Sequence, residues 1–327
     1  MMTEAELREA ILQVPLTRRG GDDFFGQFLY VQELVAGNYS SALNHGLELL
    51  QLCQRLAPEA YASIHKGTPY YWLGMAAFLV HDYQTAAFFF DAGASEDLRL
   101  GADPITNSTP GLRFIQIEAD QPDQAARQLV QATQSRVERA MAEYNARAGR
   151  LAGAPPLQLM EIREGFLRPA ASAGGDRFRT LATAFISFFL EWDHRSLLAK
   201  LRVGEGTTEP FFLHLFKGCL LFESLLKANP TRTPPPNTQL GQVLQTLHRE
   251  LWIRNDIRTA NVTFPAILAS LPAADDSMPT AVEYTARVRN TLGHDLGWNA
   301  SLDVLTYNRL VGMVASSCLH AIACLYR

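Results

Sequence analysis

No run of alternating β-branched residues occurs in this sequence, and that absence most strongly limits the folds open to it. Long segments with apolar residues at helical spacing are instead separated by short breaks rich in Gly, Pro and Asn. The clearest segment is 209–228, in which most residues are apolar. With 47% hydrophobic and 19% charged residues, the chain can also bury a substantial core. We therefore predict an all-α protein.

The length of 327 residues suits two domains of ordinary size. The helical pattern stops at 147–156, which contains two Gly and ends in Pro-Pro, so we place the boundary there. This predicts domains at 1–150 and 157–327. Residues 1–157 carry 12 basic and 18 acidic residues, and residues 158–327 carry 17 and 15. A contact with a polyanion is therefore expected in the second domain, and as a local site.

Two segment pairs near the N-terminus have the pattern of helical hairpins. In the first, a helix over 24–36 follows a break at the Arg-Arg-Gly-Gly of 18–21, and a turn at 37–39 leads to a second helix. In the second, a helix over 70–78 and a helix beginning near Thr85 flank a turn at 81–83. The second pair resembles a tetratricopeptide hairpin, in which a Leu-Gly pair meets an Ala and a large aromatic residue.

Later segments predict further helices. We expect helices at 121–147, 178–201, 209–228, 238–257 and 280–293, and a Pro-rich loop over 265–279. The last helix is expected to begin with Ser301 as its N-cap and Asp303 in its first turn.

A cluster of reactive side chains lies at 287–298. Arg289 is followed directly by Asn290, and four residues separate Arg289 from His294, the last of them being Gly293. Together with its place before the last helix, and with the apolar segment 217–227 that carries Glu223 and Lys227, this motif resembles HEPN-domain ribonucleases and their Arg-x4-6-His signature. Leu296 stands where one subgroup of that family has Tyr, which argues against that subgroup.

The resemblance implies a chemistry for these residues. His294 would transfer the proton, Arg289 would bind the phosphate oxygens, and Asn290 would orient one of them. The implied reaction is metal-independent cleavage of single-stranded RNA, with a 2′,3′-cyclic phosphate as product. No cofactor and no metal are implied, and a homodimer with a composite groove is expected.

Two arginines compete for the phosphate-binding role. On a straight helix Arg287, Asn290 and His294 share one face, whereas Arg289 points roughly 140° away from His294. The family pattern favours Arg289, which then requires the helix to loosen at Gly293 or the pair to meet across a dimer. We assign Arg289, and keep Arg287 with Glu223 and Lys227 as RNA-binding or supporting residues. Glu223 and Lys227 can also be a simple i,i+4 ion pair.

Other features have simpler interpretations. Glu191, Asp193 and His194 are close in sequence but lack the spacing of a helical zinc site, which favours a solvated patch. The four cysteines form no Cys-x-x-Cys pair, so we expect buried free thiols. Neither a signal peptide nor an apolar run of membrane-spanning length is recognisable, which predicts a cytoplasmic protein without membrane contact.

The resemblance to HEPN-domain ribonucleases implies an endoribonuclease of prokaryotic antiviral defence or of a toxin-like response. Its N-terminal helical domain would bind a protein partner, a regulatory ligand or the RNA. The alternative is a non-catalytic α-helical scaffold that binds RNA or protein and uses its HEPN-like half to dimerise.

Overall fold

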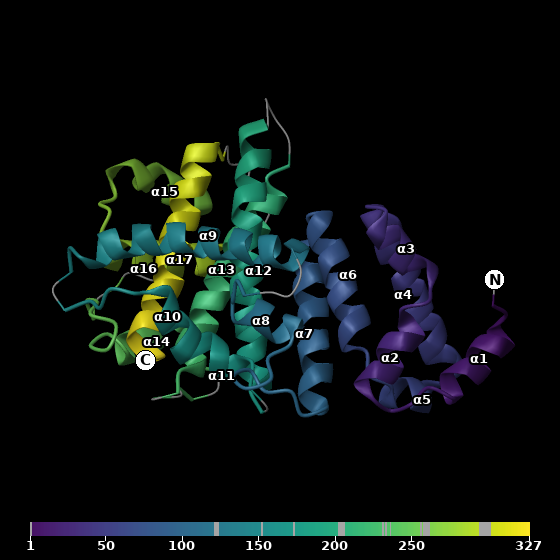
Figure 1. Ribbon diagram of the computed structural model, residues 1–327. Coiled ribbons are helices and arrows are strands. Elements are labelled where there is room, and N and C mark those ends of the chain that lie inside the picture. Colours follow the sequence, from purple (N-terminus) through teal and green to yellow (C-terminus); the bar gives the residue numbers. More distant parts are fainter. Residues whose placement is uncertain are drawn as a thin grey trace. The chain divides into compact units, whose positions relative to one another are not determined.

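The structure is a computed structural model. It describes residues 2–120, 124–151, 153–172, 174–201, 207–230, 232, 234–235, 237–255, 257, 262–293 and 302–327. All regular elements in these ranges are helices, and the only β-type pairing among them is an isolated bridge between Asp103 and Asn107 (Figure 1). The predicted all-α class is confirmed.

The chain divides into two compact units. Unit 1 comprises 1–130 with 171–174, and unit 2 comprises 131–170 with 175–327. The long helix α9 (Gln124–Ala148) contributes residues to both units. The helical pattern does end at Ala148, close to the break predicted at 147–156, but the division between the units falls within α9.

Over its described residues, unit 1 contains eight short and medium-length helices in addition to the first residues of α9. They are α1 (Glu4–Leu12), α2 (Arg18–Phe25), α3 (Leu29–Val35), α4 (Tyr39–Leu56), α5 (Pro58–Ser63), α6 (Gly67–Leu79), α7 (Tyr83–Arg99) and α8 (Pro110–Ile115). α6 and α7 form the predicted hairpin about a turn at 80–82. A Cβ on Gly74 would lie 2.9 Å from the ring of Phe90, so the missing side chain lets the two helices approach closely.

The start of unit 1 differs from the sequence-based expectation. The Arg-Arg-Gly-Gly segment is the beginning of α2, where the Thr17 hydroxyl accepts a hydrogen bond from the Gly20 amide. A Cβ on Gly21 would lie 2.0 Å from the His65 carbonyl oxygen, so this glycine serves close packing within a helix. The predicted helix over 24–36 is interrupted, because α2 ends at Phe25 and α3 begins at Leu29.

Unit 2 contains the remaining helices. They are α10 (Leu159–Ile162), the π-helical turn η1 (Arg163–Leu167), α11 (Arg168–Ala170), α12 (Asp176–Leu201), α13 (Glu209–Ala228), α14 (Leu240–Thr246), α15 (Phe264–Ser270), the 3-10 turn η2 (Leu271–Ala273), α16 (Met278–Leu292) and α17 (Val304–Leu325). α17, yellow in Figure 1, packs against α12, α13 and α16 and is the central helix of this unit.

Three boundaries in unit 2 correct the predictions. The expected helix over 238–257 is limited to α14, and the expected Pro-rich loop contains α15, whose first turn accommodates Pro265. α17 has Asp303 as its N-cap, which accepts hydrogen bonds from the amides of Leu305 and Thr306. Ser301, the predicted cap, lies outside the described residues.

Within the described part of the chain, α17 alone has the length and apolar composition that could cross a membrane. From the sequence alone, no run of that kind is expected. In the structure, 83% of the apolar window of this helix is buried, as is usual for the core helix of a helical unit.

Candidate functional site

Arg289 lies in the last turn of α16 and is held by a carboxylate from α13. Its Nε donates to Glu223 Oε2 at 2.5 Å, and Lys227 Nζ donates to the other oxygen of the same carboxylate at 2.5 Å. The Glu223 side chain is buried, whereas 31% of the Arg289 side chain is exposed. The structure thus brings Arg289 together with the Glu223–Lys227 pair, from a different part of the sequence. The Glu223–Lys227 pair also has the predicted i,i+4 geometry.

Asn290 and Arg287 take different places on α16. The Asn290 side-chain oxygen accepts a hydrogen bond from Arg289 Nη1 at 3.3 Å, so Asn290 accompanies Arg289. Arg287 Nη2 instead lies 2.5 Å from Glu283 Oε1, one turn earlier, and its guanidinium sits 5.9 Å from the ring centre of Tyr284. Neither contact directs Arg287 towards Glu223.

The end of α16 falls within the Arg289–His294 motif, at the glycine where the sequence predicts that the helix loosens. α16 ends at Leu292, and Gly293 is its C-cap, with its amide donating to the Arg289 carbonyl at 3.1 Å. His294 follows directly and lies outside the described residues, as do Leu296 and Trp298. The predicted approach of His294 to Arg289 or Arg287 therefore stays a prediction.

The thiol nearest to Glu223 in the sequence is not accessible. Cys219, one turn before Glu223 on α13, is fully buried, and burial raises the pKa of its thiol strongly. Cys53 and Cys318 are buried free thiols as well, and Cys324 is half-buried, which agrees with the predicted use of cysteine in this sequence.

A second buried carboxylate with two cations was missed by the sequence analysis. Glu191 on α12 is buried, and its Oε1 accepts from Lys217 Nζ at 2.5 Å, while Arg195 Nη2 lies 3.6 Å from Oε2. Asp193 faces elsewhere, since its Oδ2 accepts from Arg136 Nε at 3.0 Å and from Arg139. The interpretation of this region as one solvated patch is therefore wrong for Glu191. The i,i+4 spacing of Glu191 and Arg195 is the sequence signal from which this ion pair could have been predicted.

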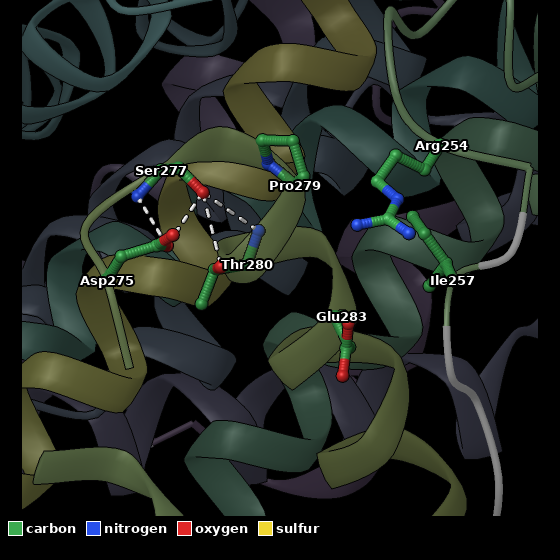
Figure 2. Close-up of a pocket in the computed structure, with 7 residues that line it drawn as sticks. All are labelled: Arg254, Ile257, Asp275, Ser277, Pro279, Thr280 and Glu283. Carbon is green, nitrogen blue, oxygen red and sulfur yellow. Dashed lines mark hydrogen bonds between the residues drawn. The ribbon is translucent and has the colours of Figure 1, made fainter. Parts of the chain in front are cut away.

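A cavity of about 410 Å³ lies at the N-terminal end of α16 (Figure 2). Figure 2 shows Arg254 on one side and Asp275, Ser277 and Thr280 on the other. Hydrogen bonds from Thr280 and Ser277 lower the pKa of Asp275. The residues that line the cavity are Arg254, Ile257, Asp275, Ser277, Pro279, Thr280 and Glu283.

This cavity is separate from the Arg289 site. Among its lining residues only Glu283 is connected with the motif, through its pair with Arg287. Charges of both signs and two hydroxyl groups suit a small polar molecule, but Asp275 is already engaged by its neighbours. Over the described ranges, no three His, Cys, Asp or Glu side chains are grouped as metal ligands.

Comparison with known proteins gives no family for this chain. No family model matches it, and no curated protein and no solved structure is significantly similar.

Proposed function

We propose that this protein is a metal-independent endoribonuclease for single-stranded RNA, with Arg289 and His294 as catalytic residues. The observation that carries the proposal is the anchoring of Arg289 by the buried Glu223, at the end of the helix that directly precedes His294. With Nε on Glu223 and one N–H of Nη1 on Asn290, Arg289 keeps Nη2 and the second N–H of Nη1 to bind the oxygens of a phosphate.

The reaction follows from the groups present. The ribose 2′-hydroxyl attacks the adjacent phosphorus, the bond to the 5′-oxygen of the next nucleotide breaks, and a 2′,3′-cyclic phosphate and a 5′-hydroxyl remain. His294 transfers the proton, because an imidazole titrates near neutral pH. Arg289 stabilises the charge that develops on the non-bridging oxygens, and Asn290 helps to hold the guanidinium. Lys227 shares Glu223 with Arg289 and adds positive charge.

The position of Arg287 makes it the weaker candidate for phosphate binding. Its ion pair with Glu283 neutralises it, and its guanidinium packs near Tyr284. We therefore assign Arg287 a supporting role. Arg289, in contrast, shares one carboxylate with Lys227, so that this group of three side chains carries a net positive charge.

We further propose a cytoplasmic homodimer in prokaryotic antiviral defence or a toxin-like response. Unit 1 would then bind a regulator, a partner protein or RNA. The exposed leucines Leu213 and Leu220 on α13 support self-association, because they lie seven residues apart and hence on one face of the helix.

The test is RNA cleavage in the presence of EDTA. The native protein should cut single-stranded RNA and leave cyclic phosphate ends. His294→Ala should lower the rate at least about 100-fold, which is the smaller effect expected of a general acid–base residue. His248→Ala is the matched control, since the described contact of this half-buried histidine is a local bond to the Gln245 carbonyl. Equal cleavage by the His294 variant, with the fold intact by circular dichroism, would refute the proposal.

The second candidate is a non-catalytic scaffold that binds RNA or protein and dimerises through its HEPN-like half. The exposed Leu213 and Leu220 favour it as much as they favour a dimeric nuclease. Binding of RNA by the native protein without any cleavage product would select this function.

A further inference from the structure

The cluster formed by Glu191, Lys217 and Arg195 contains two cations and only one carboxylate, so one positive charge is not balanced within it. The buried Glu191 is already paired with Lys217 at 2.5 Å, and Arg195 adds a second cation at 3.6 Å. One carboxylate and two cations leave a net charge of +1. Both cations reach solvent, with 20% of the Lys217 and 27% of the Arg195 side chain exposed. The cluster therefore presents a cationic surface that folding alone does not require.

Arg195 is the less firmly held of the two cations. Its Nε is buried and has no hydrogen-bond partner among the described residues. The distance between its Nη2 and Glu191 is longer than a hydrogen bond. An oxyanion arriving at the cluster would give this guanidinium a partner, whereas Lys217 already has one.

The same arrangement occurs twice along α13. Lys217 pairs with Glu191, and Lys227 pairs with Glu223, which also holds Arg289. Ten residues of helix separate the two lysines by about 15 Å along the axis and about 80° around it. The exposed Leu220 lies between them in the sequence.

Phe216, on the N-terminal half of α13, lies close to the end of α16. A Cβ on Gly293 would be 3.6 Å from the ring of Phe216, the residue that precedes Lys217. Hence the N-terminal half of α13 adjoins the point from which the chain continues to His294.

We propose that Lys217 and Arg195 bind a phosphodiester of the same RNA strand whose scissile phosphate lies at Arg289. The strand would follow α13 within the composite groove of the proposed homodimer and cross the distance between the clusters in a few nucleotides. Two cationic clusters at a fixed separation fit the regular charges of a nucleic acid backbone. This inference rests on the proposed function and adds a sequence-independent second phosphate site.

The experiment measures binding, so that it does not depend on catalysis. A fluorescent single-stranded oligonucleotide of about eight nucleotides, with 2′-O-methyl groups in place of the nucleophile, is titrated with the full-length protein at several salt concentrations. The main variant combines Glu191→Gln, Lys217→Met and Arg195→Gln, which leaves no buried charge unpaired. Arg195→Gln alone is the milder variant and keeps the Glu191–Lys217 pair. Arg55→Gln in unit 1 has the same net charge change as either variant and is the matched control.

We expect the triple variant to bind about tenfold more weakly, as is typical when a charge-assisted hydrogen bond is removed. The slope of log affinity against log salt should fall by about 0.7 for each phosphate that the protein no longer binds. Arg195→Gln should change both quantities in the same direction by less, and Arg55→Gln should change neither. Unchanged affinity and slope in both variants would overturn the second site, even if the native protein cleaves RNA.

Two further outcomes separate this inference from the proposed function. Binding that depends on Lys217 and Arg195, together with no cleavage by the native protein, supports the second site and refutes the nuclease. A polyglutamate peptide serves as the comparison probe. If it binds as tightly as the oligonucleotide and with the same dependence on the cluster, the surface fits an acidic protein, and the proposed RNA site is wrong.

Discussion

Two buried carboxylates in unit 2 hold four cations beside them. Glu223 fixes Arg289 and Lys227, and Glu191 fixes Lys217 with Arg195 nearby. A buried carboxylate without partners is costly, so each glutamate must recruit cations from neighbouring turns or helices. The cations gain fixed positions from this requirement. At the residue scale, the site is therefore organised by two acids rather than by the arginines that would contact a substrate.

The buried histidine His214 predicts how stability depends on pH. Its Nε2 donates to the Phe188 carbonyl and its Nδ1 accepts from the Tyr307 hydroxyl, and burial lowers its pKa from 6.5 to about 4. The unfolded chain therefore binds more protons between pH 6.5 and 4, so the free energy of unfolding should fall as the pH drops through this window. The expected loss is about 3 kcal/mol, measured by urea unfolding at each pH.

His214→Gln is the control for this dependence. Glutamine can donate to the Phe188 carbonyl and accept from Tyr307, but it does not titrate. The variant should lose less stability towards pH 4, although His320, whose pKa burial also lowers, keeps part of the effect. An unchanged pH dependence in the variant would contradict the assignment to His214.

At the residue scale the sequence predicts only local partners. The pair Glu223–Lys227 follows from i,i+4 spacing, and the structure contains it. The contact of Glu223 with Arg289 joins residues 66 positions apart, and no local pattern encodes it. Arg289, Asn290 and Glu223 could each be selected from the sequence, but their convergence required the packing of α13 on α16.

Whole helices were predictable where the chain carries clear end signals. The bounds of α13 match the expected 209–228, because Pro210 occupies its first turn and Asn229-Pro230 follows its end. α2 was missed because Gly20 and Gly21 usually mark a break. Here they allow the carbonyl oxygens of Pro15 and His65 to approach the helix closely. This packing requirement cannot be deduced from the helix propensities of the residues.

A substitution at Gly218 tests how closely α13 packs against α12 and α17. A Cβ at this position would lie 2.5 Å from the buried Phe188 ring on α12 and 2.6 Å from Val314 on α17. Helix propensity alone would make alanine stabilising by about 1 kcal/mol. We expect the overlap to dominate, so that Gly218→Ala lowers the free energy of unfolding by about 1–3 kcal/mol in urea unfolding. Ser224→Ala on the same helix should change it by less than about 0.5 kcal/mol. If Gly218→Ala raised the free energy of unfolding, α12, α13 and α17 would be able to move apart without loss of stability, and this prediction would be wrong.

At the scale of the molecule, the chain consists of two units, each with its own apolar core. The class of fold and the presence of two parts follow from composition and helical periodicity. The exact division does not, because α9 continues through it without a break in its pattern. The loops that connect helices were also poorly predicted, since the first turn of α15 contains Pro265, which the sequence alone suggests as a loop residue.

The proposed homodimer is tested on the exposed face of α13. Leu213 and Leu220 are 45% and 40% exposed, and burying them against a second copy would stabilise a dimer. Leu213→Glu combined with Leu220→Glu should give a monomer in size-exclusion chromatography with light scattering. Val35→Glu, at an exposed position in unit 1, should leave the mass unchanged. A native monomer, or a dimer that persists in the double variant, would contradict this interface.

The central place of α17 has a consequence for protein synthesis. α12, α13 and α16 all pack against this helix, yet each leaves the ribosome before it. Their apolar faces therefore have no complete partner until the last helix emerges. Unit 1 can close its core much earlier, because nearly all of its residues precede position 131. During translation, unit 1 should therefore fold while unit 2 still lacks part of its core. Chaperone binding or aggregation of the nascent chain should be concentrated in α12, α13 and α16, whose apolar faces are exposed until α17 has been synthesised.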